Sequence, residues 1–214
     1  MQKGLFITFE GGEGAGKSTQ IKLLGEKLRE QGRAVVLTHE PGGTPGAQLI
    51  REMLLKGEAG RWDKETEALL LFAARRDHLI KKIRPALERG EYVLSDRFAD
   101  STIAYQGYGY GYDENMMEMI RQLYKMTVGD LKPHTTFILD IDPAIGLKRS
   151  CDRVGNTEKR FEENMDFSFH QNLRQGFLEI ARNNPDRCVV VDANQPVDAL
   201  HQAIAAIAKE RGLC

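Results

Sequence analysis

Short, almost continuously apolar runs alternate along this chain with longer segments in which apolar residues recur every three or four positions. The short runs are rich in β-branched and aromatic residues and lack the alternation of a half-exposed strand. Strands with two apolar faces need cover on both sides, so the pattern is typical of a parallel sheet between layers of helices. We predict five such strands, at residues 5–9, 34–38, 92–95, 136–140 and 188–192.

The longer segments predict helices between these strands. From Ser18 to Gln31, Ile21, Leu24 and Leu28 recur at helical spacing, and Gly32 marks the end of the helix. Pro85 should disturb a second helix, because proline has no N–H to donate. No repeat or linker interrupts the alternation, so residues 1–214 are predicted to form one α/β domain. The further helices are predicted at 47–56, 64–89, 114–128, 144–151, 165–183 and 197–211.

Composition narrows the class of protein. With 30 basic and 31 acidic residues the net charge is −1, which gives no general reason to expect a nucleic-acid or membrane partner. The three cysteines show no C-x-x-C spacing, which argues against a disulfide framework or a zinc site and favours a reducing compartment. No signal peptide precedes the first strand, and no apolar run approaches the roughly 18 residues of a membrane span. We therefore expect a cytoplasmic protein.

The segment between the first strand and the first helix carries the strongest chemical signal. Gly11-Gly12-Glu13-Gly14-Ala15-Gly16-Lys17-Ser18 matches G-x-x-x-x-G-K-[ST] in the strand-then-helix context that this motif requires. In such a P-loop, backbone N–H groups cradle phosphates, the lysine reaches the β- and γ-phosphates and the hydroxyl binds Mg²⁺. The helix N-terminus also favours an anion. A purely structural glycine turn is the alternative.

Other polar residues follow the predicted strands at their carboxyl ends, where ligands bind in sheets of this kind. They include Glu10, His39-Glu40-Pro41, Asp96-Arg97, Asp140 and Asp142. A GTPase switch is not favoured, because Asp152-Arg153-Val154-Gly155 follows no strand and the sequence contains no N-K-x-D. An arginine directly after Asp96 suits a protein that grips a second phosphorylated molecule, since its planar fork matches phosphate.

Together these segments resemble the bacterial thymidylate kinase family over essentially the whole chain. The resemblance implies an ATP- and Mg²⁺-dependent enzyme that phosphorylates dTMP to dTDP by direct in-line transfer, in dTTP biosynthesis. It further implies a P-loop nucleoside monophosphate kinase fold, usually a homodimer, with a short mobile lid at about 150–163. Its motifs are Phe9–Ser18, Glu40-Pro41-Gly42-Gly43-Thr44, Leu71–Arg76, Asp96-Arg97-Phe98, Ser101-Thr102, Ala104-Tyr105-Gln106-Gly107, and the basic stretch from Gly146-Leu147-Lys148-Arg149 through Arg160.

The resemblance and the side-chain chemistry together give expected roles. Lys17, Arg97, Arg153 and Arg160 are expected to be catalytic, and Ser18 and Asp96 to hold Mg²⁺. The expected ATP contacts are Gly11, Gly12, Glu13, Gly14, Ala15, Gly16, Lys17, Ser18, Thr19, Arg149, Asn194 and Gln195. The expected dTMP contacts are Glu13, Pro41, Arg51, Phe72, Arg76, Arg97, Ser101, Thr102, Tyr105 and Gln106.

Simpler interpretations remain open at several of these positions. Arg97 could pair with Asp96, Arg51 could face solvent, and Asn194-Gln195-Pro196 could be a plain turn. Phe72 and Arg76 share one helix face, which suits stacking on a base and donation to its O4, but a core phenylalanine beside a surface arginine would look the same. The basic lid could likewise be a solvated face. For the whole chain, the alternatives are another small-metabolite kinase or a nucleotide-gated regulatory protein.

The sequence also departs from the family pattern. Glu13 places a carboxylate inside a phosphate cradle, so its side chain is expected to turn away from the phosphates. Gly14 stands where some relatives have an arginine, which shifts that role to the lid, and His39 replaces a common arginine. Tyr108, Tyr110 and Tyr112 interrupt a usually glycine-rich stretch, with no role decided by the sequence. The Glu40-Pro41 bond is predicted to be cis, as is often found in this family.

Overall fold

The computed structural model describes residues 4–56, 61–152 and 165–214. In this part of the chain five parallel strands form one sheet in the order β2-β3-β1-β4-β5. Each predicted strand is confirmed to within one residue at either end, as is the predicted class of fold. The strands are β1 (Phe6–Glu10), β2 (Val35–His39), β3 (Tyr92–Asp96), β4 (Thr135–Asp140) and β5 (Cys188–Asp192).

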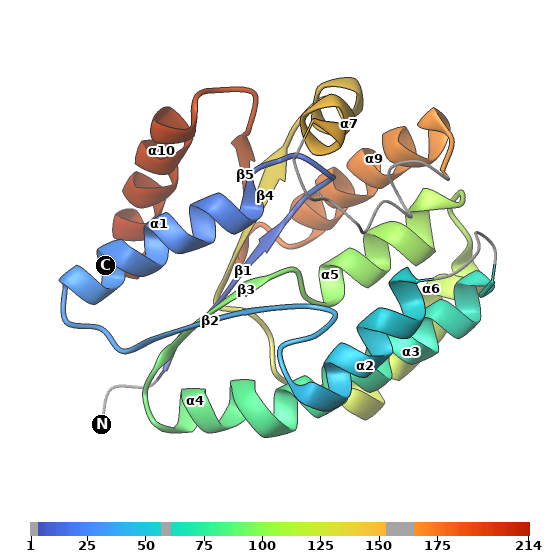
Figure 1. Cartoon of the computed structure of the whole chain (residues 1–214), viewed down its shortest axis with the longest axis horizontal. Coiled ribbons are helices and arrows are strands. Elements are labelled where there is room, and N and C mark those ends of the chain that lie inside the picture. Colours follow the sequence, from blue (N-terminus) through green and yellow to red (C-terminus); the bar gives the residue numbers. More distant parts are fainter. Residues whose placement is uncertain (1–3, 57–60, 153–164) are drawn as a thin grey trace.

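Helices cover both faces of the sheet (Figure 1). One face is covered by α1 (Lys17–Glu30) and α10 (Val197–Glu210). The other is covered by α3 (Lys64–His78), α4 (Arg84–Glu88), α6 (Glu114–Thr127) and α9 (Phe167–Asn183). Two further helices flank these layers: α2 (Pro45–Leu55), which packs on α3, and α7 (Pro143–Cys151), which follows β4.

The central strand explains the layering, because successive side chains of a strand point to opposite faces. Ile7 and Phe9 of β1 are fully buried in the core that contains Leu24 of α1 and Ile204 of α10. Phe6 is buried in the opposite core with Phe72 of α3. The apolar run of β1 therefore supplies both cores and holds its carboxyl end, where the glycine-rich motif begins, at the middle of the sheet.

The predicted helix over 64–89 is disturbed as expected. Helix α3 ends at His78, a π-helical turn covers Leu79–Ile83, and α4 continues from Arg84. Pro85 lacks an N–H and its ring crowds the carbonyl four residues earlier, so the regular hydrogen-bond ladder cannot run through this point.

A helical segment that the apolar pattern did not predict follows β3. It consists of α5 (Ala99–Thr102) and a π-helical stretch, Ile103–Gly109. Its glycines mask the helical pattern but serve packing, since a Cβ built at Gly109 would lie 2.4 Å from the Phe169 ring of α9. The tyrosines lie here too: Tyr110 packs edge-on against Phe169 at 5.0 Å between ring centroids. This aromatic stretch is thus partly a contact with α9.

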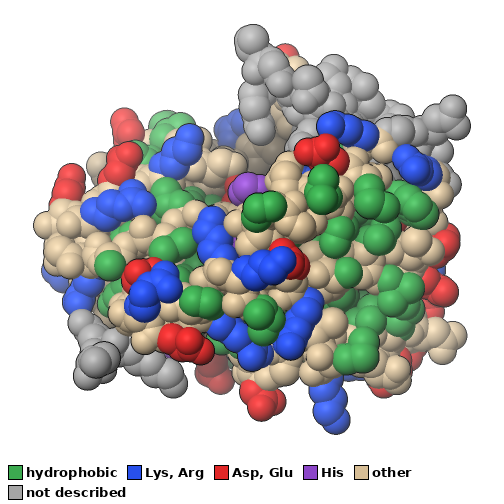
Figure 2. Space-filling model, turned by 60° about the horizontal axis from the view of Figure 1, so that its bottom comes forward, with side chains coloured by type: hydrophobic (Ala, Val, Ile, Leu, Met, Phe, Trp, Pro, Cys, Tyr) green, Lys and Arg blue, Asp and Glu red, His purple; other side chains and the backbone are tan. Residues whose placement is uncertain are grey.

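The surface carries no sign of one dominant charge on the face that Figure 2 presents, where acidic and basic side chains are interspersed. No helix in the described ranges is long and apolar enough to cross a membrane.

Candidate active site

A cavity of about 660 Å³ opens at the carboxyl ends of β1, β2 and β3. This is the edge of the sheet at which the sequence predicts ligand binding. The glycine-rich loop forms one wall, and α2, α3 and the segment after β3 form the others. Its lining includes Glu13–Thr19, Thr38–Pro41, Arg51, Glu67, Leu71, Arg75, Asp96–Phe98, Ser101, Thr102, Tyr105 and Gln106.

The glycine-rich loop has the backbone of an anion cradle. Gly14 and Gly16 have φ values of +66° and +89°, a region that glycine enters at little cost. Gly16 caps α1 without a side-chain hydrogen bond, whereas Thr44, Asp63 and Asp113 cap α2, α3 and α6. No side chain therefore caps the start of α1, which leaves this helix N-terminus open to an anion in the cavity.

Lys17 folds back over this loop. Its Nζ donates to the carbonyl oxygens of Gly11, at 3.1 Å, and Gly12, at 2.7 Å. Burial and the nearby Arg97 charge lower the pKa of Lys17 to about 8. The cation is thus held beside the cradle, in a place where an incoming polyphosphate would raise its proton affinity.

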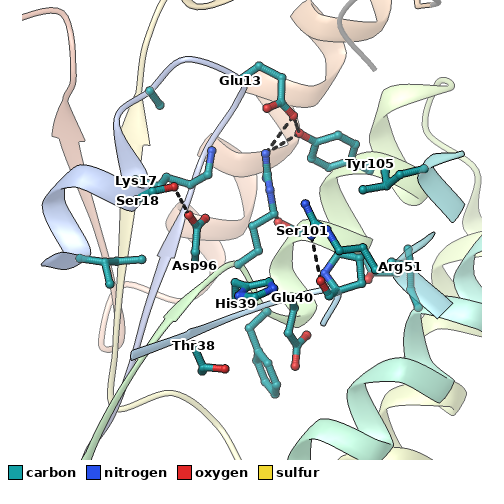
Figure 3. Close-up of a pocket in the computed structure, with 18 of the residues that line it drawn as sticks. Glu13, Lys17, Ser18, Thr38, His39, Glu40, Arg51, Asp96, Ser101 and Tyr105 are labelled. Carbon is teal, nitrogen blue, oxygen red and sulfur yellow. Dashed lines mark hydrogen bonds and ion pairs between the residues drawn. The ribbon is translucent and has the colours of Figure 1, made fainter. Parts of the chain in front are cut away.

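Ser18 and Asp96 meet beside the lysine (Figure 3). Ser18 Oγ donates to Asp96 Oδ2 at 2.5 Å. Two oxygen ligands fit Mg²⁺, which keeps several waters and is completed by substrate phosphates rather than held in a protein cage. In the described ranges no cluster of three or more acidic, histidine or cysteine side chains offers such a cage.

Arg97 lines the cavity and has a strained backbone conformation, with φ of +68°. Its Nη1 donates to Gly11 O at 3.0 Å and Ser101 Oγ at 3.1 Å. Its Nη2 donates to Glu13 Oε1 at 2.9 Å and Tyr105 Oη at 2.8 Å. The ion pair of Arg97 is therefore with Glu13, and the guanidinium joins the glycine-rich loop to the segment after β3.

Glu13 turns away from the cradle, as its charge requires. Its carboxylate accepts hydrogen bonds from Arg97 and from the Tyr105 hydroxyl (Figure 3). Burial opposes its ionisation, but the charges of Arg97 and Lys17 prevail and hold the pKa of Glu13 at about 2. The next residue has no room for a side chain, since a Cβ at Gly14 would lie 2.0 Å from Gly146 O of α7. An arginine at position 14 is excluded by this contact.

Glu10 supports the turn that carries Arg97. Its carboxyl group, fully buried at the end of β1, accepts from Phe98 N at 2.7 Å and from Ser101 Oγ at 2.5 Å. Burial and the neighbouring Asp100 raise the pKa of Glu10 well above its usual range. Glu10 thus ties the end of β1 to the strained turn after β3.

The loop after β2 forms the opposite wall. The Glu40-Pro41 bond is cis, which confirms the prediction. Arg51 lines the cavity from α2 and donates from Nη1 to Pro41 O at 2.8 Å. His39 also lines this wall, beside Arg51 (Figure 3).

Two predicted base contacts do not lie in the cavity. Phe72 is only 1% exposed and packs in the core below α3, and Arg76 donates to Thr127 O of α6 at 3.1 Å. Leu71 and Arg75, also four residues apart, line the cavity instead. Each step along a helix rotates a side chain by about 100°, so an error of one residue moves the pair to another face. The packing of α3 therefore turns Leu71 and Arg75, rather than Phe72 and Arg76, toward the cavity.

Arg75 is held by several hydrogen bonds at the wall of the cavity. Its Nε donates to Glu40 Oε2 at 2.7 Å, and its Nη2 donates to Phe98 O and Thr102 Oγ1. Its Nη1 is buried and has no hydrogen-bond partner among the described residues. Only the pairing of distant segments reveals this residue as a site residue; in the sequence it is one of two adjacent arginines.

The structure brings Ser101, Thr102, Tyr105 and Gln106 to the same cavity, as predicted. Gln106 Nε2 donates to Glu67 Oε2 at 3.0 Å, so a buried glutamate that sequence reasoning missed orients this amide. No local signal distinguished Glu67 from the other acidic residues at the start of α3.

Other predicted residues lie apart from the cavity. Arg149 donates to Ala193 O at 3.0 Å, which places it at the loop that holds Asn194 and Gln195 after β5. Both of those residues bond back to Asp192. Asp140 pairs with Arg174, and Asp142 caps α7, so these two acids are structural. Arg153, Arg160 and nearly all of the predicted lid lie outside the described residues.

Comparison with known proteins agrees with this site. The profile of the family described as thymidylate kinase matches residues 9–204. The chain is 50% identical to the thymidylate kinase of Caulobacter vibrioides over 99% of both chains, and 49% identical to that of Magnetococcus marinus over 94% of both. The crystal structure of thymidylate kinase from Ehrlichia chaffeensis superposes with a TM-score of 0.75 at 38% identity, over 96% of this chain and 98% of that one. Arg97 joins the glycine-rich loop to a second subsite, and the chain resembles thymidylate kinases along its whole length. The protein therefore belongs to the thymidylate kinase family.

Proposed function

We propose that this chain transfers the γ-phosphoryl group of ATP to dTMP, giving dTDP and ADP. The observation that carries the proposal is the position of Arg97, whose guanidinium bonds at once to the glycine-rich loop and to Ser101 and Tyr105 across the cavity. Phosphoryl transfer depends mainly on positioning two anionic molecules and balancing their charge. A forked cation between two subsites meets that need.

The donor phosphates would lie on the N–H groups of the glycine-rich loop and the start of α1. Lys17 would leave the Gly11 and Gly12 carbonyls to reach the β- and γ-phosphates. Ser18 and Asp96, directly or through water, would hold Mg²⁺, which when bound would balance the negative charge of the phosphates. Arg149, Asn194 and Gln195 meet at the loop after β5, where they would contact adenine.

The acceptor would bind against α3 and the segment after β3. The free Nη1 of Arg75 is a donor for a base carbonyl, and Thr102 and Gln106 supply further polar contacts at the same wall. Tyr105 would close the space beside the sugar 2′ position and so disfavour ribonucleotides. Arg51 and the Pro41 loop would hold the acceptor phosphate.

The lid arginines complete the proposal. Gly14 leaves the loop without an arginine near the transferring group, so we assign that second positive charge to Arg153 and Arg160. Arg153→Ala and Arg160→Ala should lower kcat by about 10³-fold with little change in KM, because they stabilise charge that develops in transfer. A change confined to the KM for ATP would instead make them a binding clamp.

The function is tested by measuring steady-state ATP consumption with a panel of monophosphates. We expect dTMP to be the best acceptor, dUMP a poor but detectable one, since a methyl group contributes only about 1–3 kcal/mol, and CMP, AMP and GMP to be inert. UMP or GMP turnover equal to that of dTMP would contradict the acceptor assignment. No monophosphate-dependent turnover would contradict the kinase assignment, and would favour a regulatory nucleotide-binding protein.

We also propose a cytoplasmic homodimer. The three cysteines, Cys151, Cys188 and Cys214, are free thiols, as fits a reducing compartment. Large apolar side chains are exposed on three neighbouring helices: Leu49 and Met53 on α2, Leu69 on α3 and Met126 on α6. An apolar surface of this kind suits contact with a second copy of the chain.

A further inference from the structure

Four side chains form a buried hydrogen-bonded chain beneath the acceptor side of the cavity. Thr38 Oγ1 and His78 Nε2 lie 2.6 Å apart, His78 Nδ1 and Glu40 Oε1 lie 3.0 Å apart, and Arg75 Nε lies 2.7 Å from Glu40 Oε2. His78 is 0% exposed and Glu40 is 4% exposed. We call Thr38, His78, Glu40 and Arg75 the Arg75 support chain.

The chemistry of its members sets the direction of these bonds. A guanidinium only donates and a carboxylate only accepts, so Arg75 donates to Glu40 and His78 Nδ1 must carry a hydrogen. In the neutral ring, Nε2 is then the acceptor and takes the Thr38 hydroxyl hydrogen. Each member thus has one role, and both oxygens of Glu40 are occupied, one by Arg75 and one by His78.

The Pro41-Gly42-Gly43 loop packs against the Arg75 support chain. A Cβ built at Gly43 would lie 2.4 Å from His78 Nε2 and 2.7 Å from Thr38 Oγ1. The loop backbone therefore covers this pair at contact distance and shields it from solvent. Loss of the His78 donor would leave a buried carboxylate oxygen without a partner, which is costly.

At its other end, the Arg75 support chain determines where the Arg75 guanidinium points. Nε is bound to Glu40, and Nη2 is bound to Phe98 O at 3.1 Å and Thr102 Oγ1 at 3.0 Å. Because the guanidinium is planar, these bonds fix the position of Nη1 as well. Among the described residues Nη1 has no hydrogen-bond partner.

We propose that His78, acting through Glu40, is the positioning residue that holds Arg75 Nη1 for donation to a carbonyl oxygen of the acceptor base. The inference rests on the proposed function and adds the part that sets base selectivity. A fixed donor favours a base with a carbonyl at that position and rejects one with an amino group, because donor would then face donor. An arginine free to move would lose much of this discrimination.

The test compares dissociation constants for dTMP, dUMP and dCMP, by calorimetry, in folded variants of the full chain. His78→Leu should weaken dTMP and dUMP, which share the carbonyl, by about tenfold or more, and dCMP by much less. His78→Asn should stay within about threefold of the parent, since its amide N–H can occupy the Nδ1 position. His201→Leu, on α10, should change none of the three constants.

Thr38→Val gives a second variant of unchanged shape, in which loss of the hydroxyl should lower the dCMP-to-dTMP ratio of dissociation constants, and so the preference for dTMP, by about threefold. A purely structural role for His78 would weaken all three ligands equally, and an unchanged ratio in His78→Leu and Thr38→Val overturns the inference. The inference is also overturned if His78→Asn weakens binding of the three ligands as His78→Leu does. Failure of the parent chain to bind or phosphorylate dTMP would instead overturn the proposed function.

Discussion

Glu13 and Lys17 lie four residues apart in the same loop, and each depends on its surroundings for its charge. Lys17 is partly desolvated and rests on two backbone carbonyls, which are weak substitutes for phosphate oxygens. Glu13 is held ionised by Arg97. The glycine-rich loop thus holds the Lys17 cation near the donor site, whereas the Glu13 carboxylate points away from that site.

Lys17→Met should abolish phosphoryl transfer while leaving the fold intact, because the loop amides remain but the charge that develops on the transferring group is no longer balanced. Turnover and the melting temperature would be measured together, with the exposed Lys56→Met as the matched control. Turnover of Lys17→Met within tenfold of the parent would contradict the role of this lysine.

Glu13 should make stability depend on acid pH. Its pKa in the folded chain is about 2, below the usual 4.5, so its ion pair stabilises the fold above pH 4.5 and this contribution is lost as the pH falls toward 2. Relative to Glu13→Gln, the parent should gain on the order of 3 kcal/mol at neutral pH and progressively less below pH 4.5. Urea unfolding of both proteins from pH 3 to 7 measures this difference, and a constant difference would contradict it.

At the scale of whole elements, helix α7 packs backbone to backbone against the glycine-rich loop. A Cβ at Gly14 would lie 2.0 Å from Gly146 O, and one at Gly146 would lie 2.4 Å from Glu13 O. Two facing glycines therefore let the helix backbone touch the loop backbone. Helix α7 immediately precedes most of the predicted lid in the sequence. This contact therefore connects the helix before the lid to the loop at the donor site.

Gly146→Ala should separate these two backbones, with a loss of about 1–3 kcal/mol in the free energy of unfolding and a raised KM for ATP. Gly25→Ala on α1 is the control, because its new Cβ would meet only the end of the Leu37 side chain. Both changes add helix propensity, so equal effects in the two variants would show that the backbone contact is unimportant.

At the scale of the whole molecule, the neighbouring helices α2, α3 and α6 expose large apolar side chains. Figure 2 shows hydrophobic side chains gathered over one half of the face that it presents. Met126 of α6 is 73% exposed, a high value for so large an apolar side chain.

Light scattering after gel filtration should give about twice the 24.1 kDa of one chain, and Met126→Glu should shift the protein toward the monomer. Val197→Glu, at an exposed apolar position on α10 in the opposite layer, should leave the mass unchanged. A parent protein that elutes as a monomer would contradict the dimer, and equal shifts in both variants would contradict the assigned surface.

Local signals in the sequence were sufficient for much of this molecule. An apolar run is recognisable from its own residues, so all five strands were predicted to within one residue. The glycine-rich motif is equally local, because its glycines, lysine and serine act through a continuous backbone. Residues after β1, β2 and β3 could then be placed in one cavity, since parallel strands end at the same edge.

Contacts between distant segments settled the rest, because nothing in the neighbouring residues encodes them. The phase of α3 follows from its packing on the sheet, and it brings Leu71 and Arg75 to the cavity while Phe72 fills the core. Likewise, Arg97 pairs with Glu13, 84 positions away, rather than with the adjacent Asp96. The Arg75 support chain joins β2 to α3 across about 40 positions, and such a chain exists only once packing has excluded water from it.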